Sequence, residues 1–288
     1  MMHRSLLFVP GDRPDRFDKA AVSGADALIL DLEDAVVPDR KSYARSAVAE
    51  WLKEPRRIAV YVRINPLGSS QIELDLEAIL SASPDALVLP KAEGASSIEA
   101  LSTLAHGSRI PILPIATETP AAIFQLGSYC SIAHKLAGLT WGAEDLPVAM
   151  GAVSSREVDG EYTAPYELAR SLTLFAAHAC NVPAVETVFP AFIDLDGLRS
   201  YVSRARRDGF TGMLAIHPRQ IETINSGFTP SDEEVSHAVD VVRAFESSEG
   251  RGAIQLNGKM LDTPHLSSAR KILAMASTSM KKTQGSLR

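Results

Sequence analysis

The sequence is poor in cysteine, and this limits the kinds of site it can form. Among 288 residues there are two cysteines, Cys130 and Cys180, which lie fifty positions apart with no Cys-x-x-Cys spacing. A structural zinc site or a disulfide framework needs more cysteines at closer, repeated spacings. We therefore interpret both residues as reduced thiols.

Basic clusters and long apolar runs are also missing. The chain carries 29 basic and 35 acidic residues, a net charge of -6, with no block of Lys and Arg. This argues against a nucleic-acid partner, because neutralising phosphates requires a basic face. The apolar stretch at the start, residues 5–10, is too short for a signal peptide or a membrane span. We therefore predict a cytoplasmic protein with neither a nucleic-acid nor a membrane partner.

What the sequence does contain is an alternation of short apolar runs with segments of helical periodicity. Hydrophobic residues make up 45% of the chain and charged residues 22%, as in ordinary globular proteins. Each run is bounded by Pro, Gly or charge, as expected for parallel strands joined by helices. The runs begin at Ser5, Ala27, Ala59, Ala86, Pro111, Gly138, Ala184 and Gly212. Eight such units, with no Gly-x-Gly-x-x-Gly loop, predict an α/β protein of the (β/α)8 TIM-barrel class.

The last sixty residues are not needed for a barrel. We assign residues 1–228 to the catalytic barrel and residues 229–288 to a C-terminal helical tail extension, which we expect to pack on a neighbouring subunit. Ser231 and Glu234 form a capping-box pattern that predicts a helix over residues 231–246. Within the barrel, residues 146–165 are rich in Gly, Ser and charge, and we interpret them as an ordered loop over the barrel mouth.

The polar residues that end the apolar runs are the candidates for chemistry, because the active site of a barrel lies at the C-terminal ends of its strands. These residues are Asp31, Glu33, Asp34, Arg63, Asn65, Lys91, Thr117, Glu118, Glu144, Asp145 and His217.

Two of these carboxylates, Glu118 and Asp145, end neighbouring strands and should lie close together at the mouth. Two like charges repel unless one is protonated or a cation lies between them. An all-oxygen ligand set favours a hard cation, with Mg²⁺ as the best match. The alternative is that neighbouring amides or Lys91 satisfy both carboxylates without a metal.

Arg63 is suited to bind a substrate carboxylate through two parallel hydrogen bonds, which together with a metal suggests a 2-keto or 2-hydroxy acid. Arg63 could equally pair with Asp31 or Glu33. The amides of the turn from Gly142 to Leu146 would suit an oxyanion or a carboxylate, or serve only to begin a helix. For His217, orienting a loop is the favoured interpretation.

Several motifs in chain order carry a family resemblance. They are RSLLFVPGDRPDRFDKA at the start, DLEDAV (31–36), VRIN (62–65), LPK (89–91), ETP (118–120), GAEDL (142–146), AIHP (215–218) and NGKMLDTPH (257–265). With these motifs the chain resembles the citrate lyase β-subunit-like branch of the HpcH/HpaI aldolase and citrate lyase family. The match spans nearly the whole chain. One departure is Glu186, where we expect Asp in relatives.

The resemblance implies a carbon-carbon lyase that cleaves or forms a β-hydroxyacyl-CoA such as citryl-, malyl- or citramalyl-CoA. By similarity, Glu118 and Asp145 would hold Mg²⁺ and Arg63 would bind the carboxylate of the 2-keto acid. The tail residue Asp262 would be the acid/base carboxylate that reaches a neighbouring subunit's active site. The resemblance also implies a homotrimer or homohexamer.

The remaining expectations concern substrate binding. The family resemblance points to the first βα loop for the CoA phosphates, where Lys19 is the preferred contact, and we place Gly142, Ala143 and Glu144 at the substrate. Three alternatives stay open at this point: an acyl-CoA thioesterase on the same scaffold, a CoA-independent 2-keto-acid aldolase, and a non-catalytic subunit of a lyase complex. The sequence does not name the acyl group.

Overall fold

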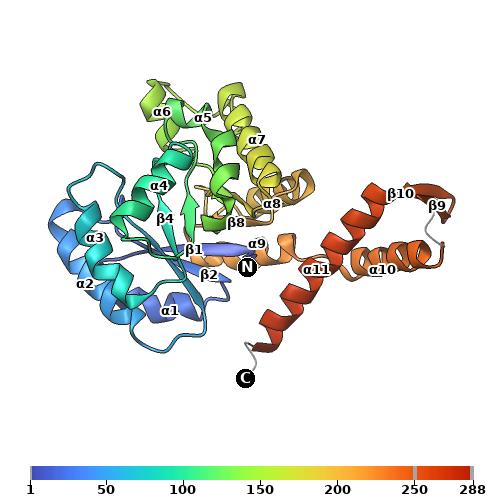
Figure 1. Cartoon of the computed structure of the whole chain (residues 1–288), viewed down its shortest axis with the longest axis horizontal. Coiled ribbons are helices and arrows are strands. Elements are labelled where there is room, and N and C mark those ends of the chain that lie inside the picture. The colour runs from blue at the N-terminus through green and yellow to red at the C-terminus, as the bar shows by residue number, and fades with distance from the viewer. Residues whose placement is uncertain (1, 249–251, 286–288) are drawn as a thin grey trace. The chain divides into compact units, whose positions relative to one another are not determined.

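The computed structural model describes residues 2–248 and 252–285, and its main body is a barrel of parallel strands surrounded by helices (Figure 1). Each of the eight barrel strands lies within one of the predicted runs, so the predicted barrel is confirmed. The strands are β1 Ser5–Pro10, β2 Ala27–Asp31, β3 Ala59–Arg63, β4 Ala86–Leu89, β5 Ile112–Pro114, β6 Leu139–Thr140, β7 Ala184–Glu186 and β8 Gly212–Ala215.

The strands follow one another in the order β5-β4-β3-β2-β1-β8-β7-β6, all in parallel pairs. The ring is completed between β5 and β6 by parallel bridges from Ile112 to Leu136 and from Ile115 to Thr140. A backbone hydrogen bond of 2.8 Å from Ala116 N to Thr140 O also joins them. Closing the ring leaves no long unpaired strand edge.

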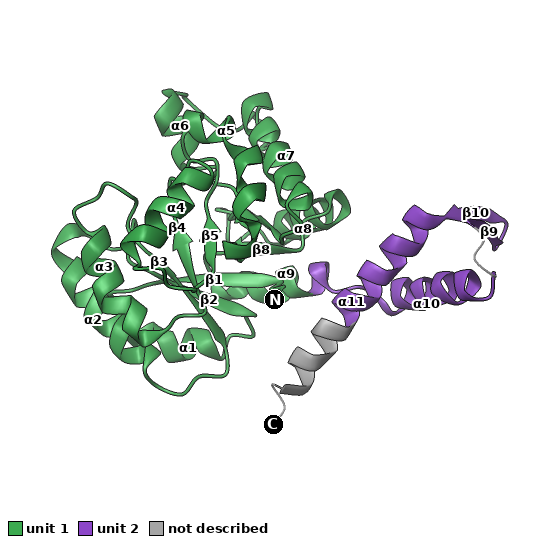
Figure 2. Cartoon of the chain, in the orientation of Figure 1, with its two compact units in different colours: residues 1–225 green, residues 226–288 purple. Residues whose placement is uncertain are grey.

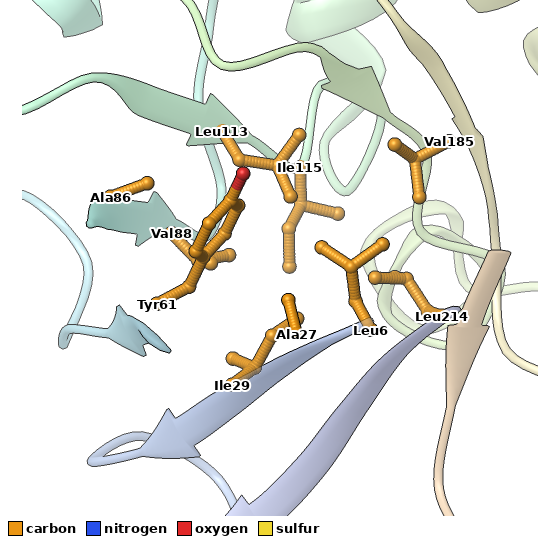
Figure 3. Close-up of a cluster of buried hydrophobic side chains, with 10 residues drawn as sticks. All are labelled: Leu6, Ala27, Ile29, Tyr61, Ala86, Val88, Leu113, Ile115, Val185 and Leu214. Carbon is orange, nitrogen blue, oxygen red and sulfur yellow. The ribbon is translucent and has the colours of Figure 1, made fainter. Parts of the chain in front are cut away.

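The inside of the barrel is filled with apolar side chains, which lie at alternate positions along the strands that contribute two of them (Figure 3). Side chains alternate between the two faces of a strand, so every second side chain of a barrel strand points toward the barrel axis. The inward residues are Leu6, Ala27, Ile29, Tyr61, Ala86, Val88, Leu113, Ile115, Val185 and Leu214. Continuing the register places Asp31 and Arg63 inward at the C-terminal mouth, whereas Glu186, next to Val185, faces the outer helices.

Helices connect the strands. They are α1 Phe17–Ala21, α2 Lys41–Leu52, α3 Ile72–Ile79, α4 Ala95–Leu104, α5 Pro120–Ile123, α6 Asp145–Met150, α7 Ala164–Ala179, α8 Leu195–Asp208 and α9 Ile221–Phe228. Short 3₁₀ segments are η1 Pro14–Arg16, η2 Pro38–Arg40, η3 Leu80–Ala82, η4 Leu126–Lys135 and η5 Pro218–Gln220. The predicted loop over residues 146–165 is in part a helix, because α6 occupies its first positions.

The chain divides into two compact units, residues 1–225 and residues 226–288 (Figure 2). The second unit contains α10 Asp232–Glu246, the antiparallel strands β9 Ala253–Leu256 and β10 Lys259–Asp262, and α11 Thr263–Gly285. Its small core is formed by Ala238, Val241, Leu261 and Ala269. The predicted capping box is present, since Ser231 Oγ accepts from Glu234 N and Ser231 N donates to Glu234 Oε2.

The cysteine interpretation is wrong in this structure, which joins Cys130 and Cys180 in a disulfide with 4.4 Å between their Cα atoms. Cys130 lies in η4 and Cys180 follows the end of α7, and these two segments pack against each other. Their separation along the chain concealed this contact, which depends on how the helices surround the barrel. Cys130 is also exposed rather than buried in the core.

No helix within residues 2–248 and 252–285 combines the length and apolar composition needed to cross a membrane.

Candidate active site

The mouth of the barrel holds a group of charged side chains from the ends of β2 and β3 and from the segments that follow β2, β4, β5 and β6, and it includes an arginine-carboxylate pair. Arg63, at the end of β3, donates from Nε to Asp31 Oδ1 at 2.7 Å and from Nη2 to Asp31 Oδ2 at 2.6 Å. Its Nη1 lies 3.0 Å from Glu33 Oε2 without hydrogen-bond geometry. The structure therefore shows the alternative pairing, in which Arg63 binds Asp31, and two of its five N–H groups are used by Asp31.

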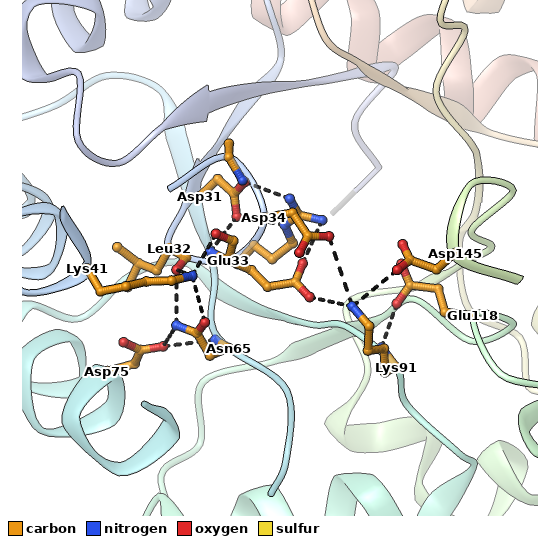
Figure 4. A network of polar contacts seen from close by, with 12 residues as sticks. Asp31, Leu32, Glu33, Asp34, Lys41, Asn65, Asp75, Lys91, Glu118 and Asp145 are labelled. Carbon is orange, nitrogen blue, oxygen red and sulfur yellow. Dashed lines mark hydrogen bonds and ion pairs between the residues drawn. The ribbon is translucent and has the colours of Figure 1, made fainter. Parts of the chain in front are cut away.

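Lys91 lies at the centre of this group, between Glu33 on one side and Asp145 and Glu118 on the other (Figure 4). Its Nζ is 2.6 Å from Glu33 Oε1 and 3.4 Å from Asp145 Oδ1. Its backbone N–H donates to Glu118 Oε2 at 2.5 Å. Lys91 has a φ of 53°, a left-handed conformation that orients its amide. One residue thus contacts both predicted metal ligands.

Glu118 and Asp145 are brought together as predicted, although in different environments. Glu118 is 4% exposed, whereas the Asp145 side chain is 33% exposed. Burial, together with the nearby charges of Asp145 and Glu33, raises the pKa of Glu118 to about 8, despite the hydrogen bond from the Lys91 amide. A buried carboxylate beside another carboxylate favours its neutral form unless a cation compensates the charge, and here Lys91 compensates it only in part.

Two other charged groups at the mouth, Glu33 and Lys91, also have pKa values shifted from their ordinary values. Burial raises the pKa of Glu33 despite Arg63 and Lys91. For Lys91, burial lowers the pKa, but the hydrogen bond to Glu33 and the surrounding carboxylates outweigh it and hold the pKa above its ordinary value. Lys91 is therefore a fixed ammonium group and unsuited to act as a base near neutral pH.

The turn that carries Asp145 packs directly on Glu118. A Cβ added at Gly142 would lie 2.5 Å from Glu118 Cγ, so only glycine allows this approach. The Gly142 N–H donates to Thr117 Oγ1 at 3.1 Å. Because this amide already donates a hydrogen bond to Thr117, the structure counts against the expectation that Gly142 binds substrate through its N–H.

Other residues predicted from strand ends have structural partners. Asn65 donates to Asp75 Oδ2 at 2.6 Å and accepts from Lys41 Nζ at 2.8 Å, at the edge of the network in Figure 4. His217 Nδ1 accepts from Arg219 N at 3.1 Å and its ring stacks on Phe192 at 4.7 Å. The favoured interpretation of His217 as a residue that orients a loop agrees with these contacts.

Of the remaining predicted residues, Lys19, Ala143 and Glu144 belong to the first unit and Asp262 to the second. Lys19 is an exposed residue of α1. Asp262 ends β10 in the second unit, 54% exposed, with its Oδ1 2.5 Å from His265 Nδ1. Ala143 is buried and Glu144 exposed in the turn after β6.

From the sequence, Glu33 and Lys91 are expected only as alternative partners, Glu33 of Arg63 and Lys91 of Glu118 and Asp145, and the structure shows these contacts. Both residues end apolar runs, which is the pattern that marks residues at the barrel mouth. The ion pair between them could not be predicted, because it joins the segments that follow two different strands, β2 and β4. Among residues 2–248 and 252–285 there is no group of three or more His, Cys, Asp or Glu side chains arranged to hold a metal. Any ion here would have two carboxylate ligands and take its remaining ligands from water or substrate, as Mg²⁺ commonly does.

Comparison with known proteins identifies the family. Residues 4–218 match the model of the HpcH/HpaI aldolase/citrate lyase family, and residues 170–279 match that of a C-C bond lyase of the TIM-barrel fold. The chain is 36% identical over 270 residues to a citrate lyase subunit beta-like protein of Mycobacterium tuberculosis, covering 94% of each chain. It is 35% identical over 283 residues to a (3S)-malyl-CoA thioesterase of Cereibacter sphaeroides, covering 95% of this chain and 94% of that one.

A solved structure is also similar throughout. CitE from M. tuberculosis, crystallised with magnesium, acetoacetate and coenzyme A, superposes with a TM-score of 0.82 at 35% identity, covering 96% of this chain and 98% of that chain. The family match and the relatives cover the barrel and most of the second unit. The chain belongs to the HpcH/HpaI aldolase/citrate lyase family, a family of enzymes.

Proposed function

We propose that the protein is a Mg²⁺-dependent carbon-carbon lyase that cleaves or forms a β-hydroxyacyl-CoA such as citryl-, malyl- or citramalyl-CoA. The products of cleavage would be a shorter acyl-CoA and a 2-keto acid. The observation that carries the proposal is the buried Glu118 beside Asp145 at the barrel mouth. The magnesium and coenzyme A bound by the M. tuberculosis structure support it.

The donor set fits the metal. Glu118 and Asp145 offer carboxylate oxygens, the ligands that Mg²⁺ prefers, and burial raises the pKa of Glu118, an effect that a bound cation would oppose by favouring the ionised form. When bound, Mg²⁺ supplies a Lewis acid that polarises the substrate oxygens and stabilises negative charge on the keto-acid half. Lys91 would hold the Asp145 carboxylate and, through its amide, the Glu118 carboxylate.

Arg63 would bind the carboxylate of the keto-acid half. Asp31 takes one edge of the guanidinium and fixes its plane, and the N–H groups that do not bond Asp31 provide the donors for a substrate carboxylate. Ala143 and Glu144 would offer their backbone amides at the same place. Gly142 contributes by allowing the turn to approach Glu118 rather than by its N–H.

Asp262 would be the acid/base residue. The ionised Asp262 would first take the proton of the substrate β-hydroxyl as that oxygen forms the keto-acid C=O. The carbon-carbon bond breaks, its electron pair passes to the thioester half, and the enolate carbon then takes the proton back from Asp262. The second unit would deliver Asp262 to the mouth of a neighbouring subunit in a homotrimer or homohexamer, and Lys19 would contact the CoA phosphates. We place the enzyme in the cytoplasm, a compartment in which its disulfide would be uncommon.

A second candidate function is a thioesterase, which the malyl-CoA thioesterase relative favours. The two activities give different products from one substrate. Purified protein is incubated with Mg²⁺ and malyl-, citramalyl- or citryl-CoA, with and without EDTA, and the products are identified by mass spectrometry. A keto acid plus a shorter acyl-CoA, both abolished by EDTA, supports the lyase, whereas free CoA with the intact hydroxy acid supports the thioesterase. No product from any of them would contradict both.

A further inference from the structure

A second carboxylate-centred network lies outside the barrel interior, behind the turn that carries Asp145. Its centre is Glu186, which ends β7 and is fully buried. Because Val185 points into the barrel, Glu186 faces the outer helices α7 and α8 and contacts none of the mouth residues directly. The proposed reaction gives it no role.

Glu186 is fully hydrogen-bonded. Its Oε1 accepts from the indole N–H of Trp141, from Tyr201 OH at 3.0 Å and from the Thr187 amide at 2.9 Å. Its Oε2 accepts from Arg170 Nε at 2.7 Å. A buried carboxylate with four donors holds its partners in fixed positions, because each donor would be costly to leave unpaired.

Among these partners, Trp141 connects the network to the mouth. It is fully buried and directly precedes Gly142, whose backbone packs on Glu118. Thr117 anchors the turn through the Gly142 amide, and Glu186 anchors it through the Trp141 side chain. The turn that ends at Asp145 is thus fixed from two sides.

We propose that Glu186 is a positioning residue for the cation site, acting through the indole N–H of Trp141 to hold Asp145 at its place beside Glu118. The inference rests on the proposed function, since it concerns the Mg²⁺ that Glu118 and Asp145 would hold. Loss of the indole N–H leaves the turn anchored on the Thr117 side alone. The two carboxylates then spend less time in the arrangement that binds a cation.

The chain offers a matched pair of variants. Trp141→Phe and Tyr201→Phe each remove one donor to Glu186 Oε1, and only Trp141 is attached to the Asp145 turn. Asp208→Asn breaks the 2.8 Å ion pair of Arg170 with Asp208 and serves as a control for general loss of stability. Glu186→Gln tests the carboxylate itself, and the Trp141→Phe variant keeps the test available if that protein does not fold.

Mg²⁺ affinity is measured by isothermal titration with the metal alone, and thermal unfolding is measured in parallel. We expect Trp141→Phe to raise the Kd for Mg²⁺ at least tenfold, and Tyr201→Phe and Asp208→Asn to change it less than threefold while lowering Tm. In the double variant, Glu186→Gln should add little to the effect of Trp141→Phe. Equal Kd values in Trp141→Phe and Tyr201→Phe, with a wild-type protein that binds Mg²⁺, overturn the inference alone. A wild-type protein that binds no Mg²⁺ overturns the proposed metal site and the inference together.

Discussion

Binding of Mg²⁺ should become much tighter between pH 6 and pH 8, because the metal must displace a proton from Glu118. Burial raises the pKa of this carboxyl to about 8 in the metal-free protein. Below that pH most molecules carry Glu118 in its neutral form, and a metal binds only the ionised form.

The size of the effect follows from this pKa. If Mg²⁺ displaces one proton, the apparent Kd is about 100 times the Kd of the ionised protein at pH 6 and about 2 times that Kd at pH 8. Affinity therefore improves about 50-fold from pH 6 to pH 8, which corresponds to about 2.3 kcal/mol of binding free energy. Above pH 8 the gain should level off. The Asp145 carboxylate adds a ligand without changing the sign of this dependence.

Isothermal titration at pH 6, 7 and 8 in two buffers with different ionisation enthalpies measures both the affinity and the number of protons released. We expect nearly one proton per Mg²⁺ at pH 6 and about half a proton at pH 8. Glu118→Gln serves as the control and should lose most affinity and release no proton. Affinity that does not vary between pH 6 and 8, with no proton released, would refute the role assigned to Glu118.

Further predictions concern stability, the metal and the acid/base residue. The folded-state pKa of Glu118 lies above its unfolded value of about 4.5, so its contribution to stability is complete at low pH and is lost as pH rises through about 8. The Tm of the metal-free wild type should therefore fall relative to that of Glu118→Gln between pH 5 and 8. Parallel curves of Tm against pH for the two proteins would contradict this. Asp145→Ala should lose both Mg²⁺ binding and turnover, and unchanged activity would remove Asp145 from the metal site. Asp262→Asn should keep Mg²⁺ binding and lower kcat by about 100-fold or more, and full residual activity would exclude it from the mechanism. Cys130→Ser should lower the free energy of unfolding by about 4 kcal/mol, because the disulfide closes a loop of fifty residues in the unfolded chain. Denaturant unfolding without reductant measures this change, and an unchanged unfolding midpoint would contradict the prediction.

The barrel could be predicted from the sequence because its strands are buried on both faces and appear as uninterrupted apolar runs. Glu118 and Asp145 could be placed together for a related reason, since both lie a few residues after neighbouring strands, and the segments that follow strands meet at one end of a barrel. The helix at Ser231 followed from a local capping pattern. These features depend on short stretches of sequence or on simple strand order.

Contacts between distant side chains could not be predicted in the same way. The disulfide depends on η4 meeting the end of α7, and the choice of Asp31 over Glu33 as the hydrogen-bond partner of Arg63 depends on rotamers at the mouth. The bridging position of Lys91 depends on its left-handed backbone conformation, which the sequence does not specify.

The buried face of α7 does not follow from apolar periodicity. Leu168 and Phe175 are 56% and 66% exposed, whereas Arg170 is buried because Glu186 and Asp208 bind its charge. Helical periodicity of apolar residues does not reveal a buried ion pair.

The most direct test of the central claim is cleavage of malyl-CoA in D₂O with Mg²⁺, followed by mass spectrometry of the products. If the carbon-carbon bond breaks and the enolate carbon is protonated, the products are glyoxylate and acetyl-CoA that carries one deuterium in its methyl group. Malate and free CoA, with no deuterium bound to carbon, would contradict the lyase and establish thioester hydrolysis instead.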